Sequence, residues 1–293
     1  MTLRHIALRI LPPVVTDAIR RVRRSPADLP GQFEVVGGGW PQPTDTNPGW
    51  EDPAIARTQA ERWPAFVAAC SDTRPLDMPH EATEHAGRNM AFHNTYLSFG
   101  YVLARAEGGR GRLSMLDWGG GLGHYAVLAG ALLPGVELDY HCKDLSAFCA
   151  EGARLLPDAT FHSDDACLER TYDLVMASGS LQCSRDWREV AAGLVRATGR
   201  YLYVTRLPVQ LTSPSVVVRQ HAGVQGFNDD LLGWFLNRDE FVGQVTARGM
   251  RLVREFYVDE YPYVPGAIEQ PDVRGFLFEP AGPTDAGSVP AES

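Results

Sequence analysis

The spacing of apolar residues changes near Gly108–Gly109. Before this point, apolar residues mostly recur at helical spacing, whereas after it short apolar runs alternate with helical patterns. That alternation is typical of a parallel sheet with crossover helices. We therefore predict an α/β domain over residues 109–280, preceded by a helical and irregular N-terminal cap over residues 1–108 and followed by a disordered tail over residues 281–293.

Short apolar runs bounded by turn residues predict the strands of this domain. Residues 239–248 have the periodicity of a helix that precedes the last two strands. The predicted strands cover residues 113–117, 137–142, 160–162, 174–177, 201–205, 252–258 and 273–278. The sequence thus predicts a sheet of seven strands.

The first hundred residues have the patterns of helices and irregular segments. Residues 53–107 favour helices with a break through 72–79, and residues 25–53 are rich in Pro, Gly, Asp and Asn and predict an irregular segment. Apolar positions in residues 3–22 are separated by arginines, and Pro12–Pro13 divides them into two short helical pieces. We expect this basic segment to dock on another subunit, giving a homo-oligomer, or to be solvated, rather than to rest on a membrane.

Composition limits the partners and the compartment. The 293 residues carry a net charge of −9, which makes nucleic acid a poor partner. Five cysteines without a Cys-x-x-Cys pair indicate a reducing compartment and no metal site. The longest apolar run, residues 126–133, is too short to span a bilayer, so we expect a soluble cytoplasmic protein. Lys143 is the only lysine, which excludes a phosphate-loop lysine.

A glycine-rich turn joins the first predicted strand to the helix that follows it. The strand ends at Asp117, and Gly119, Gly121 and Gly123 lead into a helical pattern that begins at His124. Ligands bind at this junction in open α/β sheets. Glycine allows the backbone to turn sharply and to approach a ligand closely. We expect Asp117 to accept a hydrogen bond from an ammonium group of the ligand, directly or through water.

The spacing of the glycines indicates which of two nucleoside cofactors the turn would bind. A dinucleotide site needs Gly-x-Gly-x-x-Gly, and from Gly119 the third glycine is replaced by His124. The arrangement Asp-x-Gly-x-Gly-x-Gly instead resembles the class I S-adenosylmethionine-dependent methyltransferases, a resemblance that continues to about residue 280. It implies a Rossmann-like fold and S-adenosylmethionine as the cofactor. A nicotinamide dehydrogenase is the lower-ranked alternative.

The resemblance also implies roles for residues after the later strands. Asp144 looks like the acid that takes both ribose hydroxyls, with Asp139 as the fallback, although Asp144 could also merely cap the next helix. Asp164, or next Asp165, resembles the acid that contacts the adenine amino group. Ser178 and Gln182 follow the fourth strand, in the loop that faces the transferred methyl group.

Three motifs together resemble a bacterial subgroup of methyltransferases whose genes tend to lie in polysaccharide or specialised-metabolite clusters. The expected function is methylation of a small-molecule or saccharide-type acceptor in biosynthesis. Two alternatives on the same cofactor stay open: a cyclase or decarboxylase, and a binding partner without chemistry. The motifs are Asp-Trp-Gly-Gly-Gly-Leu-Gly-His-Tyr125, Ala-Ser-Gly-Ser-Leu-Gln182 and Gly-Trp-Phe-Leu-Asn-Arg-Asp239.

The group that accepts a proton from the acceptor is less well marked. His221 lies in the long segment after the fifth strand, where this fold often forms a substrate wall, and is the first candidate. His124 and Tyr96 follow, although His124 could equally cap or pack the helix. Aromatic residues could line an acceptor pocket or belong to core and lid packing; they are Phe227, Trp234, Phe235, Tyr257, Tyr261 and Tyr263. The acceptor and the methylated atom stay open.

Overall fold

The computed structural model describes residues 33–41, 49–80, 88–221 and 231–282. The predicted helical pieces of residues 3–22 and the predicted tail from residue 283 onward lie outside these ranges. Within them, no helix is long and apolar enough to cross a membrane.

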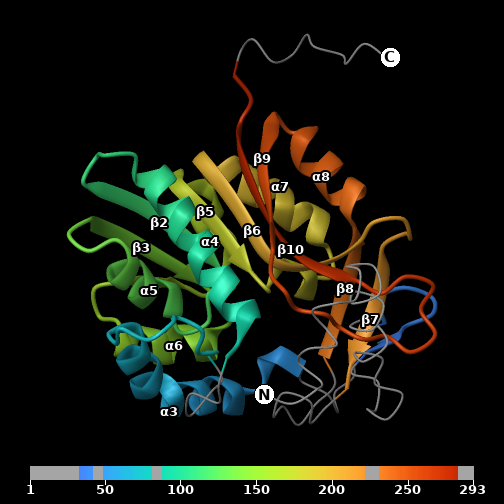
Figure 1. Cartoon of the computed structure of the whole chain (residues 1–293), viewed down its shortest axis with the longest axis horizontal. Helices are drawn as coiled ribbons and strands as arrows, with labels where there is room; N and C mark the ends of the chain where they lie inside the picture. Colours follow the sequence, from blue (N-terminus) through green and yellow to red (C-terminus); the bar gives the residue numbers. More distant parts are fainter. Residues whose placement is uncertain (1–32, 42–48, 81–87, 222–230, 283–293) are drawn as a thin grey trace, which may run out of the picture.

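A mostly parallel sheet forms the centre of the molecule (Figure 1). Its strands follow the order β4-β3-β2-β5-β6-β10-β9, and β10 is antiparallel to both of its neighbours. This sheet is Rossmann-like and confirms each of the seven predicted strands. Their bounds are β2 Arg112–Trp118, β3 Glu137–Lys143, β4 Thr160–His162, β5 Tyr172–Ser178, β6 Thr198–Gln210, β9 Met250–Tyr257 and β10 Asp272–Pro280.

The count of seven strands was incomplete, because three more strands extend the sheet: β1 (Phe33–Val35), β7 (Val216–Gln220) and β8 (Leu231–Asn237). They join it because β6 does not end at Thr205 but continues to Gln210, where it pairs with β8. β7 is antiparallel to β8, and β1 is antiparallel to β7. This extension stands beside the carboxyl end of β6.

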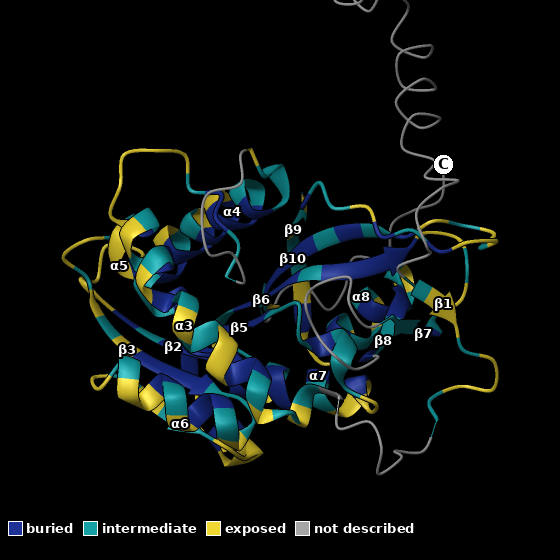
Figure 2. Ribbon diagram, turned by 90° about the horizontal axis from the view of Figure 1, so that it is seen from below, coloured by how far each residue is buried: buried dark blue, intermediate teal, exposed yellow. Residues whose placement is uncertain are grey.

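Helices cover both faces of the central sheet (Figures 1 and 2). Side chains of α4 and α5 pack with one face of the strands, and those of α7 and α8 pack with the other. The helices are α3 Pro53–Cys70, α4 Met90–Glu107, α5 His124–Leu132, α6 Ser146–Leu155, α7 Trp187–Ala197 and α8 Arg238–Thr246, with 3₁₀ turns η1 Gly49–Glu51, η2 Asp165–Glu169 and η3 Leu181–Cys183.

Local sequence explains the position of α4. The Asn89 side chain accepts a hydrogen bond from the amide of Phe92 and caps the helix, and Gly108 ends it in the left-handed conformation. Phe99 and Leu103 are four residues apart and thus share one face. That face is fully buried among strand residues of the sheet. The predicted helices on either side of a break are thereby confirmed.

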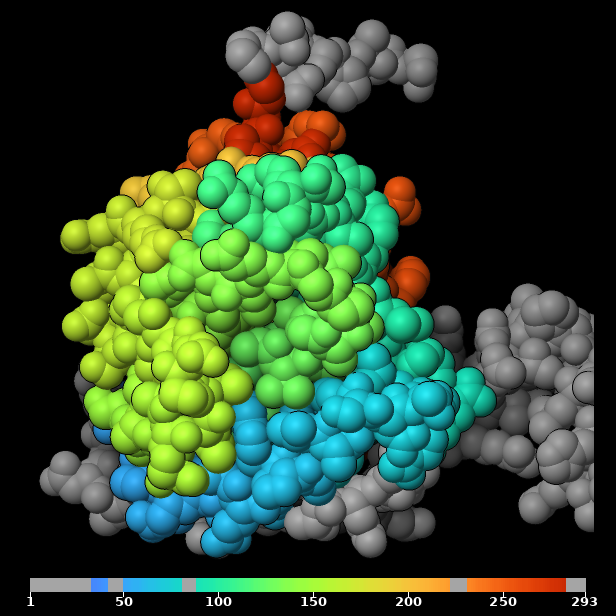
Figure 3. All heavy atoms as spheres, turned by 90° about the vertical axis from the view of Figure 1, so that its left-hand side faces the viewer, coloured from blue at the N-terminus to red at the C-terminus, as the bar shows by residue number. Residues whose placement is uncertain are grey.

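Helix α3 packs on the glycine-rich turn. Asp52 caps it and Pro53 begins it, an order that suits the fixed φ of proline and its missing amide hydrogen. Trp63 of α3 is buried against Leu122 of the turn and Phe148 of α6. Figure 3 shows the residues of α3 along the lower edge of α6, with which α3 is in contact.

A bulge interrupts β6 near its end. Leu207 pairs with Arg274 and Val204 with Phe276, so that two residues of β6, Thr205 and Arg206, lie opposite Gly275. A β carbon on Gly275 would stand 2.9 Å from Thr205 Oγ1 and 3.0 Å from the Tyr203 hydroxyl. Such bulges redirect side chains and are frequent beside active sites.

We expect Gly275→Ala to lower the free energy of unfolding by about 1–3 kcal/mol, the usual cost of overpacking a buried site. Urea denaturation measures this loss. The control is Gly243→Ala in the exposed face of α8, where no atom lies within 4 Å of the added carbon. That change should stabilise the protein by up to about 1 kcal/mol. Equal effects of the two substitutions would contradict the packing described at the bulge.

Candidate functional site

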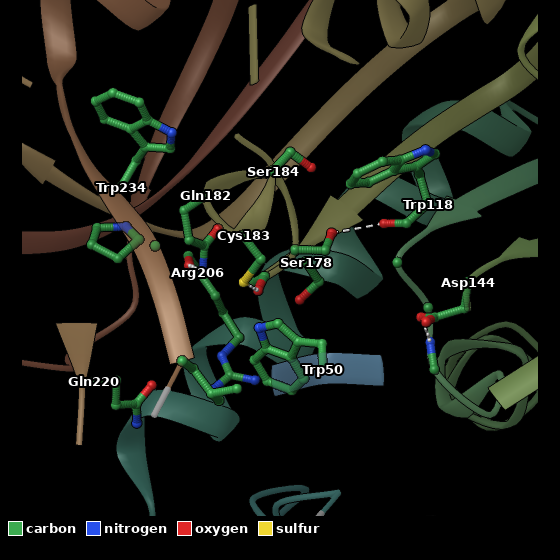
Figure 4. A pocket seen from close by; sticks show the side chains of 18 of the residues that line it. Trp50, Trp118, Asp144, Ser178, Gln182, Cys183, Ser184, Arg206, Gln220 and Trp234 are labelled. Atoms are coloured by element: carbon green, nitrogen blue, oxygen red, sulfur yellow. Dashed lines mark hydrogen bonds between the residues drawn. The ribbon is translucent and has the colours of Figure 1, made fainter. Parts of the chain in front are cut away.

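A pocket of about 470 Å³ lies at the carboxyl ends of β2, β3, β5 and β6 (Figure 4). Its size is within the range of about 300–1,000 Å³ that is common for small-molecule sites. The chain leaves β2 toward β3 on one side, while β5 lies on the other, so the pocket stands at the point where the strand order reverses. Open α/β sheets bind ligands at this point.

The three predicted glycines have different surroundings. All have positive φ, with values of 72° for Gly119, 60° for Gly121 and 88° for Gly123. A β carbon on Gly119 would overlap Ser180, and one on Gly123 would stand 2.7 Å from Leu156 Cδ1. At Gly121 the nearest atom would be Gln59 Oε1, 3.6 Å away. Gly119 and Gly121 line the pocket, whereas Gly123 packs beneath it.

Asp117 lies below the turn, fully buried, and is not part of the pocket wall. Its Oδ2 accepts a hydrogen bond of 2.6 Å from the Tyr140 hydroxyl, and its Oδ1 has no hydrogen-bond partner among the described residues. A β carbon on Gly120 would stand 2.5 Å from Oδ2, so only glycine fits above the carboxyl group. Burial raises the pKa of Asp117 to about 7.

Asp144 lies in the pocket wall at the end of β3. Its Oδ2 accepts a hydrogen bond of 2.7 Å from the amide of Gly121, and its Oδ1 accepts one of 2.7 Å from the amide of Leu145. Burial raises the pKa of Asp144, against the two amide hydrogen bonds, which lower it. The carboxylate is therefore fixed between the glycine-rich turn and the start of α6, and the hydrogen bond from Leu145 agrees with the local-capping interpretation.

Of the two adjacent acids after β4, the structure places Asp165 in the pocket wall and Asp164 outside it. Asp165 Oδ1 accepts a hydrogen bond of 3.1 Å from Trp118 Nε1 and lies 3.4 Å from Lys143 Nζ. Asp164 instead caps η2 by accepting a hydrogen bond of 3.0 Å from the amide of Ala166. Asp165, the second choice from the sequence, is therefore the acid of this pair that lines the pocket.

Ser178, the last residue of β5, and Gln182 of η3 both line the pocket. The hydroxyl oxygens of Ser178 and Tyr125 are 2.7 Å apart. Gln182 Nε2 donates a hydrogen bond of 3.3 Å to the carbonyl oxygen of Arg206. Gln182 Oε1 is buried and has no hydrogen-bond partner among the described residues.

The three candidate proton acceptors are not brought together. His124 lines the pocket, and its ring stacks on that of His80 with 4.2 Å between the centroids. Tyr96 is buried outside the pocket, where its hydroxyl donates a hydrogen bond of 2.8 Å to the Met78 carbonyl. His221 lies at a separate cavity, with its Nε2 3.8 Å from Glu34. Only His124 of the three is placed to meet a ligand of the main pocket.

Sequence reasoning missed several residues of the wall. Trp50, Gln59 and His80 come from the irregular segment, α3 and the loop after it, and Arg206 follows the predicted end of β6. Burial lowers the pKa of His80 to about 3, with a further contribution from the Arg206 charge, so His80 is neutral near pH 7. A charged residue directly after an apolar strand was the available signal for Arg206. Nothing in the sequence marks His80.

The predicted aromatic lining divides into two groups. Trp234 and Phe235 of β8 line the pocket. Tyr257 and Tyr261 are exposed and stand outside it. Tyr263 does not line the pocket either, and Phe227 lies outside the described residues.

No protein-family model matches the chain, and no curated protein matches its sequence. Among solved structures, it is similar to magnesium protoporphyrin IX methyltransferase from Synechocystis PCC 6803 with bound SAM, at 11% identity and TM-score 0.46, over 79% of this chain and 97% of that one. The CcbJ methyltransferase from Streptomyces caelestis is 15% identical, with a TM-score of 0.43, over 69% of this chain and 94% of that one. DesVI from Streptomyces venezuelae is 16% identical, with a TM-score of 0.42, over 64% of this chain and 90% of that one. Similarity at this level carries no conclusion about the activity of this chain.

The raised pKa of Asp117 makes its contribution to stability dependent on pH. The folded carboxyl group keeps its proton up to its pKa of about 7, while the unfolded group loses it near the ordinary aspartate pKa of 3.8, so stability falls as pH rises from about 4 to about 7. The expected loss is on the order of 4 kcal/mol, from about 1.4 kcal/mol per pKa unit. Asp117→Asn should lack this loss.

Urea denaturation of both proteins across this pH range measures the difference. Comparison with the wild type removes the contributions of the other titrating groups, which the two proteins share. The exposed Asp158→Asn is the control and should follow the wild-type curve. A constant difference between Asp117→Asn and the wild type at every pH would contradict a buried, protonated Asp117.

Proposed function

We propose that this chain is an S-adenosylmethionine-dependent methyltransferase that acts on a small-molecule acceptor. The observation that carries the proposal is the convergence of Gly121, Asp144 and Asp165 on one pocket at the reversal point of the sheet. These residues come from three consecutive strand ends. The resemblance assigns the ribose contact to Asp144 and leaves Asp165 as the second candidate for the adenine contact.

The residues present fit this cofactor. Gly121 offers an open backbone surface, since a side chain there would enter the pocket. The two oxygens of Asp144 suit a pair of vicinal ribose hydroxyls, which can donate to a carboxylate. Asp165, whose Oδ1 contacts both Lys143 and Trp118, is our candidate to accept a hydrogen bond from the adenine amino group. The glycine spacing, with His124 where a dinucleotide turn needs its third glycine, disfavours a dinucleotide.

The reaction requires little chemistry from the protein. S-adenosylmethionine supplies a methyl group already activated on a sulfonium. The chain has to hold the acceptor in line with that group and exclude water, and both effects come from a shaped, largely apolar wall. His124 is our candidate to accept a proton from the acceptor, with Ser178 and Gln182 close to the reacting groups. His221 and Tyr96 are not part of this proposal.

The finer parts of the proposal concern the acceptor and the cap. We infer a biosynthetic small-molecule or saccharide-type acceptor, in line with the resemblance to the subgroup of polysaccharide and specialised-metabolite clusters. We also infer that residues 1–108 act as a cap, because Trp63 and its neighbours on α3 pack directly on the glycine-rich turn. Helix α3 would then hold the turn in its binding conformation.

Isothermal titration with S-adenosylmethionine, S-adenosylhomocysteine and NAD tests the cofactor. We expect the two sulfur nucleosides to bind and NAD not to bind. Gly121→Arg should abolish binding, because it fills the pocket and strains a backbone with φ of 60°. Gly130→Arg is the matched control on the exposed side of α5, where no atom lies within 4 Å, and it should bind as the wild type does.

Binding of NAD alone, or equal binding by both variants, would refute the proposed site. Incubation with acceptors then separates methyl transfer from other chemistry on the same cofactor. Only methyl transfer adds the mass of one methylene group to the product. A product without that mass would indicate a cyclase or decarboxylase instead.

A further inference from the structure

Arg206 occupies an unusual backbone position in the pocket wall. Its φ is 52°, in the left-handed region that residues with a side chain rarely adopt. It is one of the two residues of the β6 bulge opposite Gly275. A conformation of this kind is strained and persists where the surrounding structure holds it in place, which is often beside functional sites. The result of the bulge is a guanidinium group that lies within the pocket (Figure 4).

Neighbouring groups hold this side chain in place. The Gln182 amide donates its hydrogen bond to the Arg206 carbonyl, which fixes the backbone of the bulge. The guanidinium carbon lies 4.5 Å from the centre of the Phe92 ring, a cation–π contact. Nη2 lies 3.8 Å from Glu260 Oε2, and the side chain is 20% exposed. These contacts orient the planar group and leave part of it accessible to a ligand.

The two ends of the pocket differ in charge. Asp144 and Asp165 stand at the end near β3 and β4, where we place the nucleoside. Arg206 belongs to β6, three strands from β3 in the order β3-β2-β5-β6, or about 14 Å at 4.7–4.9 Å per strand. Beside the polar neighbours Glu260 and Gln182, the pocket wall that β7 and β8 contribute is mostly apolar, with Val218, Leu231, Trp234 and Phe235. A charge pair is stronger in such a setting than in water.

We propose that Arg206 binds an anionic group of the acceptor, a carboxylate or a phosphate, and that the acceptor is an apolar or aromatic molecule that carries this group. The proposal rests on the proposed function and narrows its substrate class. The planar fork of arginine matches both anions with two parallel hydrogen bonds. The apolar walls of β7 and β8 receive the body of the molecule, and the redirected side chain at the bulge selects its charge.

Matched probes test this assignment on the full-length protein. The pairs are 4-hydroxybenzoate with 4-hydroxybenzamide, and phenyl phosphate with phenol; each pair differs in the anionic group. Dissociation constants come from ligand-observed NMR, with and without saturating S-adenosylhomocysteine. In the wild type, at least one anion should bind about tenfold or more tightly than its neutral partner, the usual range for a hydrogen bond to a charged group. The preferred pair identifies the carboxylate or the phosphate.

Three variants test whether Arg206 causes the preference for the anion. Arg206→Gln and Arg206→Gly should both abolish the preference for the anion while S-adenosylhomocysteine binds as before. Glycine also accepts the positive φ, so this variant keeps the test valid if glutamine disturbs the fold. Arg248→Gln is the control: it replaces an exposed arginine just after α8 that donates hydrogen bonds to Gln244, and it should retain the full preference.

Other results overturn the assignment. Equal binding of anion and neutral partner by the wild type, or a preference that survives in both Arg206 variants, excludes Arg206 as the anion-binding group. A matching loss of S-adenosylhomocysteine affinity in the variants would mean that Arg206 holds the carboxylate of the cofactor instead. Failure of the wild type to bind the nucleoside at all refutes methyl transfer, while the titrations without nucleoside still report on Arg206.

Discussion

The structure depends on one close packing: a backbone turn folded directly over a buried carboxyl group. Asp117, the second-to-last residue of β2, is fully buried, and Gly120 passes so near its Oδ2 that no side chain could stand between them. Tyr140 from the neighbouring strand completes the enclosure by donating to the same oxygen. The conformation of the turn, and therefore the shape of the pocket above it, follows from this buried group.

Part of this architecture could be predicted from the sequence because it depends on residues that are adjacent in the chain. An apolar run followed by Asp117 and spaced glycines specifies a strand, a tight turn and a helix, whatever the rest of the chain does. Asp144 was found for the same reason, since it directly follows a strand. Predictions of this kind require only neighbours in sequence.

Other features depend on contacts between distant segments, and the sequence did not reveal them. Strand β6 seemed complete at Thr205 because Arg206 and Pro208 interrupt the apolar run, yet pairing with β8 carries it to Gln210. The choice between Asp164 and Asp165 depends on Trp118 and Lys143, which reach only one of them. His80 joins the pocket through stacking on His124, a contact between residues far apart in sequence.

The position of the only lysine has a practical consequence. Lys143 stands in the pocket wall with its ammonium 4.8 Å from the centre of the Trp118 ring, and its side chain is 17% exposed. Apart from the chain's own amino terminus, an amine-directed reagent has no other primary amine to modify. Chemical labelling at this position therefore reports directly on the wall of the pocket.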